Sequence, residues 1–183
     1  MRRPIVGVMG SGAERHDELA APLGRWIAVR GYHLLTGGGG GVMEAVSEAF
    51  ASVRARRGLV IGVLKGRPDA EGFVVGSPPN RWVEVPVRTH LPLSGSEGTD
   101  LRSRNHINVL TADLVVGLPG GDGTRSEMEL AVRYGRPVIA FVGATERPPG
   151  WPAIPLAATL EEFERLAVLL LEPARGTRAH PSR

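Results

Sequence analysis

The sequence contains no cysteine, and Lys65 is the single lysine among its 22 basic residues. The absence of cysteine excludes disulfide bonds, thiol catalysis and cysteine-ligated metals. The remaining basic residues are arginines spread along the chain, which points to a coding bias rather than a basic binding face. A net charge of +3 is only weak support for a polyanionic partner. We therefore expect no nucleic-acid partner.

Long apolar segments are missing as well. No run approaches the roughly 20 residues of a membrane span, and the apolar stretch after the basic N-terminus is interrupted at Gly10, too early for a signal peptide. We expect a cytoplasmic protein without a membrane partner. The length of 183 residues and the hydrophobic fraction of 42% predict one globular domain over residues 1–172 and a disordered tail over residues 173–183.

Several motifs that would assign a function are also absent. The chain has no G-x-x-x-x-G-K-[ST] loop for ATP hydrolysis, no G-x-G-x-x-G dinucleotide fingerprint and no G-x-S-x-G nucleophile elbow. Its five histidines lack the spacing of metal ligands, and a lone histidine such as His106 is expected to be structural. We expect neither a metal nor a resident cofactor.

Short apolar strands alternate with amphipathic helices along the chain. Strands are expected at residues 4–9, 32–36, 58–64, 81–87, 113–118 and 137–142, helices at residues 16–30, 42–56, 99–111, 127–134 and 160–171, and a loop at residues 67–80. Pro86 puts the fourth strand at the end or the edge of a sheet. Strands that are apolar throughout lie in a parallel sheet covered on both faces. The pattern predicts the α/β class, as a doubly wound, Rossmann-like parallel sheet.

The most informative segment is LPGGDGTRSE at residues 118–127. Glycines between an apolar strand and a helix allow backbone N–H groups to face an anion, and the helix N-terminus adds partial positive charge. Glu127 adds a carboxylate one helical turn beyond the loop. The ligand-binding residues expected in this segment are Gly120, Gly121, Asp122, Gly123 and Thr124.

The same segment has a purely structural interpretation. Thr124 and Glu127 have the spacing of a capping box, in which each side chain bonds a backbone N–H group at a helix start. On spacing alone, the structural and the functional interpretation of Glu127 are evenly balanced. The three glycines favour a ligand site, because they are more than a helix start requires.

Two further glycine-containing loops follow expected strands, at residues 10–12 and 37–41. Ligands of doubly wound sheets bind beyond the carboxyl ends of the strands. We therefore expect the three glycine loops to meet there around a nucleotide or another phosphorylated small molecule. The ligand-binding residues expected in these two loops are Gly10, Ser11, Gly38 and Gly39.

A pair of arginines precedes the strand that leads to the third loop. Arg102 and Arg104 are two residues apart in an expected helix, so they cannot share a face. We expect one guanidinium to reach the site, where it suits phosphate recognition, and the other to face solvent. The alternative is that such an arginine only pairs with Asp100 or Glu97.

The nine residues from Pro119 to Glu127 resemble the P-G-G-x-G-T-x-x-E motif of the Lonely Guy family, whose members are nucleoside 5′-monophosphate phosphoribohydrolases long misnamed lysine decarboxylases. The resemblance covers residues 6–142. It implies a Rossmann-like fold, a homodimer, and catalytic roles for Glu127 and Arg104, the latter by alignment of residues 101–105 with the family's M-H-x-R-K segment. A decarboxylase using pyridoxal phosphate would need a Schiff-base lysine, and only Lys65 is present.

The chain departs from that family at Leu101, Arg102 and Asn105, which replace methionine, histidine and lysine. Its second glycine loop is also shorter. In both respects it resembles a sister branch that includes molybdenum-cofactor carrier proteins, which hold a phosphate-bearing pterin without converting it.

Three functions remain open on the sequence. The first is hydrolysis of the N-glycosidic bond of a nucleoside 5′-monophosphate, with Glu127 stabilising the oxocarbenium-like charge and Arg104 binding the phosphate or assisting the leaving base. The alternative is a non-catalytic carrier of molybdenum cofactor or another phosphorylated ligand. A nucleotide-sensing domain is less well supported, because no partner domain is present in the sequence.

Overall fold

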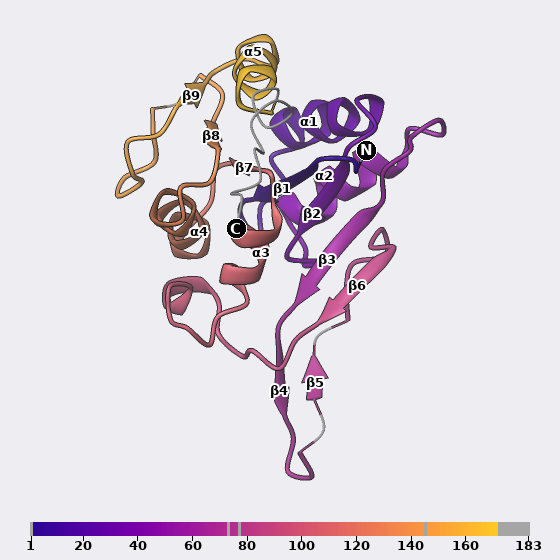
Figure 1. The fold of residues 1–183 in the computed structure, drawn as a ribbon, viewed down its shortest axis with the longest axis vertical. Helices are drawn as coiled ribbons and strands as arrows, with labels where there is room; N and C mark the ends of the chain where they lie inside the picture. Colours follow the sequence, from indigo (N-terminus) through magenta and orange to yellow (C-terminus); the bar gives the residue numbers. More distant parts are fainter. Residues whose placement is uncertain (1, 73, 77, 145, 172–183) are drawn as a thin grey trace, which may run out of the picture.

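The computed structural model describes residues 2–72, 74–76, 78–144 and 146–171. Its elements alternate between strands and helices along the chain (Figure 1). They are β1 (Ile5–Met9), α1 (Asp17–Val29), β2 (His33–Thr36), α2 (Val42–Ala51), β3 (Val60–Leu64), β4 (Gly66–Pro68), β5 (Val74–Gly76), β6 (Val85–Arg88), the 3-10 turn η1 (Gly95–Glu97), α3 (Asn105–Thr111), β7 (Leu114–Gly117), α4 (Asp122–Arg133), β8 (Val138–Phe141), β9 (Leu156–Ala157) and α5 (Leu160–Leu171).

Seven strands form one sheet in the order β6-β3-β2-β1-β7-β8-β9, and every pair of neighbours in it is parallel. Strands β2, β3 and β6 extend the sheet on one side of β1, and β7, β8 and β9 extend it on the other. The strand order reverses between β1 and β7, which is where doubly wound sheets bind ligands. The predicted fold class is confirmed, and β6, which carries Pro86, lies at an edge as expected.

Two apolar layers hold helices against the opposite faces of this sheet. One contains Val6 and Leu114 of the sheet together with Phe50 of α2 and Phe163 of α5. The other contains Val115, with residues of α3 and α4. Neighbouring residues of β7 thus face opposite layers, as the two-residue repeat of a strand requires. Burial on both faces explains why the strands are apolar throughout.

Three expected helix boundaries were wrong. The helix expected at residues 42–56 ends at Ala51, where Ser52 bonds back to the Ala49 carbonyl (2.7 Å). The helix expected at residues 99–111 starts only at Asn105, after hydrogen-bonded turns that include Ser103 N–H to the Asp100 carbonyl (2.8 Å). The helix expected at residues 127–134 starts five residues earlier, at Asp122.

The loop expected at residues 67–80 instead contains β4 and β5, which pair as an antiparallel hairpin. It extends from the body of the molecule at the bottom of Figure 1. Within the described part of the chain, no helix has the length and apolarity to cross a bilayer. The tail predicted at residues 173–183 lies outside the described residues.

Candidate functional site

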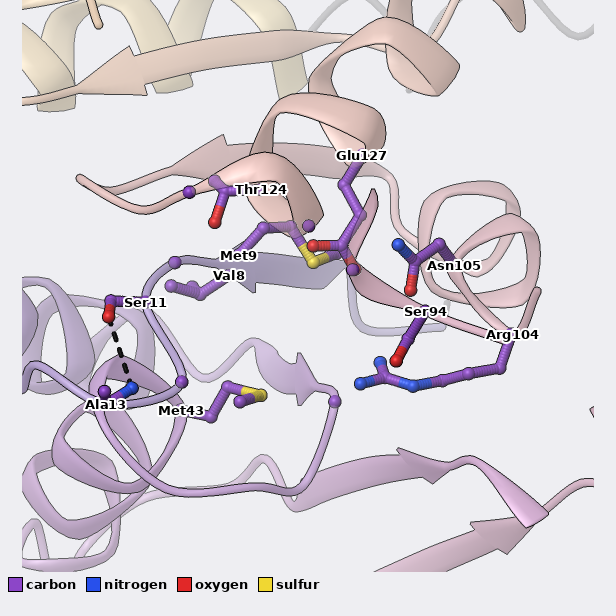
Figure 2. A pocket seen from close by; sticks show the side chains of 16 residues that line it. Val8, Met9, Ser11, Ala13, Met43, Ser94, Arg104, Asn105, Thr124 and Glu127 are labelled. Carbon is purple, nitrogen blue, oxygen red and sulfur yellow. Dashed lines mark hydrogen bonds between the residues drawn. The ribbon is translucent and has the colours of Figure 1, made fainter. Parts of the chain in front are cut away.

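A cavity of about 350 Å³ opens where the loops after β1, β2 and β7 converge (Figure 2). Its polar side chains come from the loop after β1, from η1, and from the starts of α3 and α4. The lining residues are Val8, Met9, Gly10, Ser11, Gly12, Ala13, Gly37, Met43, Ser94, Gly95, Arg104, Asn105, Gly121, Gly123, Thr124 and Glu127.

Ser11 joins the three glycine loops. Its backbone N–H donates to the Pro119 carbonyl (3.1 Å), and its own carbonyl accepts from Val42 N–H (2.9 Å). Its hydroxyl oxygen accepts from the N–H groups of Ala13 (3.2 Å) and Glu14 (3.0 Å), which shapes the first loop. The convergence expected from the sequence is therefore present, and it is held by backbone hydrogen bonds.

The third glycine loop leads into α4, which begins one residue after its N-cap, Gly121. No side chain caps this helix, and its first backbone bond runs from Arg125 N–H to the Gly121 carbonyl (3.1 Å). The capping-box interpretation was wrong, because Thr124 and Glu127 lie inside the helix. The N–H groups of its first turn lack intrahelical partners and are available to an anion.

Glu127 presents its carboxylate to the cavity from α4, beside Met9 in Figure 2. The residue is buried, and its Oε1 accepts a hydrogen bond from Asn108 Nδ2 (2.8 Å). Burial raises the pKa of the Glu127 carboxyl, while the charge of Arg104 and the bond from Asn108 act in the opposite direction. The protonation state of the Glu127 carboxyl therefore depends on its neighbours Arg104 and Asn108.

Arg104 directly precedes α3 and extends its guanidinium into the cavity (Figure 2). Its Nε and Nη1 atoms are buried, and within the described part of the chain neither has a hydrogen-bond partner. Burial lowers the pKa of the guanidinium, and the charge of Glu127 raises it. Arg102 instead lies at the surface and pairs with Asp100 (3.1 Å). One arginine faces the site and the other faces solvent, as expected.

The packing of Arg104 depends on Gly37. A Cβ at Gly37 would overlap the guanidinium nitrogens of Arg104. Gly37 lies within the run of glycines at residues 37–41, where no pattern separates a glycine that packs on a side chain from one that faces a ligand. For this reason Gly37 could not be singled out from the sequence. Asn108 was not predicted either, because no motif connects it to Glu127.

The other predicted ligand-binding residues have different surroundings. Gly38 and Gly39 line a second hollow of about 300 Å³, which shares Arg104 with the first. Gly120 packs so close to Ser11 N that a Cβ there would come within 2.7 Å of it. Asp122 lines neither cavity, and its carboxylate pairs with Arg125 (3.2 Å) at the surface.

His106 has the structural role expected of it. Its Nε2 lies 2.9 Å from the Asp100 carbonyl and its Nδ1 lies 2.6 Å from the hydroxyl of Tyr134. A carbonyl only accepts, so Nε2 carries the proton and Nδ1 accepts from the tyrosine. The imidazole thus ties the turn before Arg104 to the end of α4.

The buried carboxyl of Glu127 predicts a pH-dependent effect on stability. With a folded-state pKa above the ordinary 4.5, wild-type protein loses stability as the pH rises through that folded-state value, because the folded state binds the proton more tightly than the unfolded state. Glu127→Gln removes this loss while its amide oxygen still accepts from Asn108. We expect the variant to gain stability relative to wild type as the pH rises, and to lose this advantage below about pH 4. Urea unfolding across this pH range measures the difference.

The control is Glu129→Gln, on the same helix, where the carboxylate is 43% exposed and pairs with Arg125. Its stability should stay within about 1 kcal/mol of that of wild type across the pH range, because an exposed ion pair contributes little. A Glu127→Gln variant whose difference from wild type is the same at acid and neutral pH would contradict the raised pKa.

The comparisons with known proteins agree on the family and the fold. A family model described as the SLOG cluster4 family matches residues 3–151. A protein of Archaeoglobus fulgidus, described as uncharacterized, is 30% identical over 143 residues, which are 77% of this chain and 82% of that protein.

Two solved structures are similar over nearly the whole chain. One is described as the molybdenum cofactor binding protein from the phototrophic bacterium Rippkaea orientalis, with a TM-score of 0.69 and 29% identity over 93% of this chain and 99% of the other. The other is described as the molybdenum cofactor carrier protein from Chlamydomonas reinhardtii, with a TM-score of 0.70 and 26% identity over the same shares of the two chains.

Proposed function

The chain belongs to the SLOG cluster4 family, and on that premise we propose that it binds a phosphorylated small molecule of the molybdenum-cofactor class, a phosphate-bearing pterin, and holds it without converting it. The observation that carries this proposal is the guanidinium of Arg104, buried and without a hydrogen-bond partner among the described residues at the wall of the cavity. A buried charge with unmet hydrogen bonds is costly unless a counter-ion satisfies it. An anionic ligand supplies that counter-ion.

The cavity suits a phosphate group at the start of α4. Gly121 and Gly123 line it, and a Cβ at Gly121 would meet no atom of the described residues within 4 Å, apart from its two neighbours in the chain, so the space beside the first turn of the helix is open. The N–H groups of this turn and the hydroxyl of Thr124 would donate to phosphate oxygens. Arg104 would contact the ligand from the opposite wall.

The two similar structures support the choice of ligand class. Both are described as binding or carrying molybdenum cofactor, and each matches over 93% of this chain. The glycine loops and Arg104 lie within the matched family region, residues 3–151. The similarity therefore covers all the residues that we propose to contact the ligand.

A second candidate function, hydrolysis of a nucleoside 5′-monophosphate, is favoured by the carboxylate of Glu127 in the same cavity. Water would form a bond to the anomeric carbon, the bond to the base nitrogen would break, and the base would leave with a proton. Glu127 would stabilise the positive charge that develops on the sugar. Burial disfavours the charged form that this role requires, which is one reason to rank the carrier first.

The two functions differ in what Glu127→Gln does. For a carrier, mass spectrometry of the denatured, freshly purified protein should detect an intact phosphate-bearing pterin in both wild type and Glu127→Gln, with affinities for it within about threefold of each other. Incubation of wild type with AMP should then release no adenine.

The hydrolase function would be supported instead of the carrier function if wild type released adenine, Glu127→Gln did not, and Glu129→Gln released it as wild type does. Absence of any bound pterin, together with no measurable affinity for AMP, would exclude both functions.

A further inference from the structure

A second hollow adjoins the first along a common wall. It lies beside the loop after β2 and the end of β3, and it shares Gly37, Met43, Ser94 and Arg104 with the first cavity. Each volume, about 350 and about 300 Å³, lies at the lower end of the roughly 300–1,000 Å³ typical of ligand pockets. The shared wall means that one ligand can occupy both.

The second hollow is more positively charged than the first. Its described lining contains Lys65 and Arg104 and no acidic residue, whereas the first cavity combines Arg104 with Glu127. Lys65 is the only lysine of the sequence, and the described residues provide it with no ion-pair partner. Both cations line this hollow, and an anion bound there would offset the repulsion between them.

The backbone of the loop at residues 37–41 has free hydrogen-bond donors among the described residues. Asn80 donates hydrogen bonds to two carbonyls of this loop. Its backbone N–H donates to the Gly38 carbonyl (2.8 Å), and its Nδ2 donates to the Gly39 carbonyl (2.8 Å). The backbone N–H of Gly38 donates to Thr36 Oγ1 (3.0 Å). Within the described part of the chain, the N–H groups of Gly39 and Gly40 have no acceptor. Both residues line the second hollow, so backbone donors remain there while the carbonyls of Gly38 and Gly39 are occupied.

We propose that the two hollows form one elongated site, and that its ligand carries a second anionic group that binds in the second hollow to Lys65 and to the N–H groups of Gly39 and Gly40. This rests on the proposed function, because the phosphate of the same ligand occupies the first cavity. Arg104 lines both hollows, and at their boundary its guanidinium contacts the phosphate of the ligand. The ligand class is thus an extended molecule with two separated anionic groups, rather than a simple monophosphate.

The test compares probes that differ by one phosphate. Titration calorimetry measures the affinity of the full-length protein for AMP, adenosine 2′,5′-bisphosphate and adenosine 3′,5′-bisphosphate. Wild type should bind at least one bisphosphate about tenfold more tightly than AMP, since the added group forms charge-assisted hydrogen bonds. Lys65→Met should lose this preference and keep the AMP affinity of wild type, whereas Lys65→Arg should retain most of it.

Arg88→Met is the control for overall charge. Arg88 is exposed, pairs in register with Leu64 across β3 and β6, and lines neither hollow. Its loss should leave all three affinities unchanged. Wild type that binds AMP but prefers neither bisphosphate, or a preference that survives in Lys65→Met, would overturn the second subsite while leaving the proposed function intact. Wild type that binds none of the probes would overturn the second subsite, and it would overturn the proposed function as well if mass spectrometry finds no pterin bound to the purified protein.

Discussion

Replacing Arg104 by methionine is expected to weaken the binding of phosphorylated ligands by about a hundredfold or more. The Nε and Nη1 atoms have no hydrogen-bond partner among the described residues, so the ligand is the group that would satisfy them. Hydrogen bonds to charged groups contribute about 1.5–3 kcal/mol each, and the loss of two corresponds to roughly two to four orders of magnitude in Kd. Titration calorimetry with AMP as the probe measures the loss.

The control for this change is Arg102→Met, which removes the same charge two residues away. Arg102 is 70% exposed and pairs with Asp100 at the surface, so its loss should leave the affinity within about twofold of wild type. Arg104→Met should remain folded, because removal of the guanidinium raises the pKa of Glu127 further and allows that carboxyl to take up a proton. Circular dichroism verifies the fold. Equal affinities in folded Arg104→Met and in wild type would remove the basis of the proposed function.

The sheet could be predicted from the sequence because burial on both faces leaves a strong local signal. Each of the six expected strands overlaps an observed one, from β1 (Ile5–Met9) to β8 (Val138–Phe141). The three strands that were not expected are two or three residues long, and β4 and β5 belong to a hairpin outside the main sheet. Strands of two or three residues are too short to show a repeat of apolar residues, so no local pattern identifies them.

The position of the cavity could also be predicted, but the detailed arrangement of the side chains around it could not. Glycines after the strands indicate an anion site because they lie at the carboxyl edge of a parallel sheet. Whether Arg102 or Arg104 faces this site depends on the turns before α3, which the expected helix at residues 99–111 did not anticipate. The need for glycine at Gly37 depends on contact with Arg104, 67 residues further along the chain. Contacts of this kind have no local signature.

The start of α4 illustrates how local patterns can mislead. A threonine followed three residues later by a glutamate matches the start of a helix, yet in the structure Gly121 is the N-cap, Thr124 lies in the first turn and Glu127 lies in the second. A helix that starts earlier leaves Glu127 facing the cavity. The first-turn N–H groups then adjoin Gly121, which has no side chain to fill the space beside them.

Gly121→Val is therefore expected to abolish the binding of phosphorylated ligands while the protein remains folded. The backbone at Gly121 (φ −86°, ψ −150°) is extended, and its Cβ would meet no protein atom within 4 Å. The valine would instead occupy the space beside the first turn of α4, where the phosphate binds in our proposal. Loss of several charge-assisted hydrogen bonds, about 1.5–3 kcal/mol each, is enough to remove micromolar affinity.

The matched control is Asp122→Val, which introduces the same side chain one residue later. Asp122 lines neither cavity and is 60% exposed, so this variant should lose at most about threefold in affinity, through the small contribution of its charge at the helix start. Gly121→Ala should lie between Gly121→Val and wild type. Calorimetric titration with AMP, after circular dichroism has verified the fold, distinguishes the three. If Gly121→Val binds AMP as tightly as wild type, the start of α4 is not the phosphate site, because a side chain larger than hydrogen cannot share that space with the ligand.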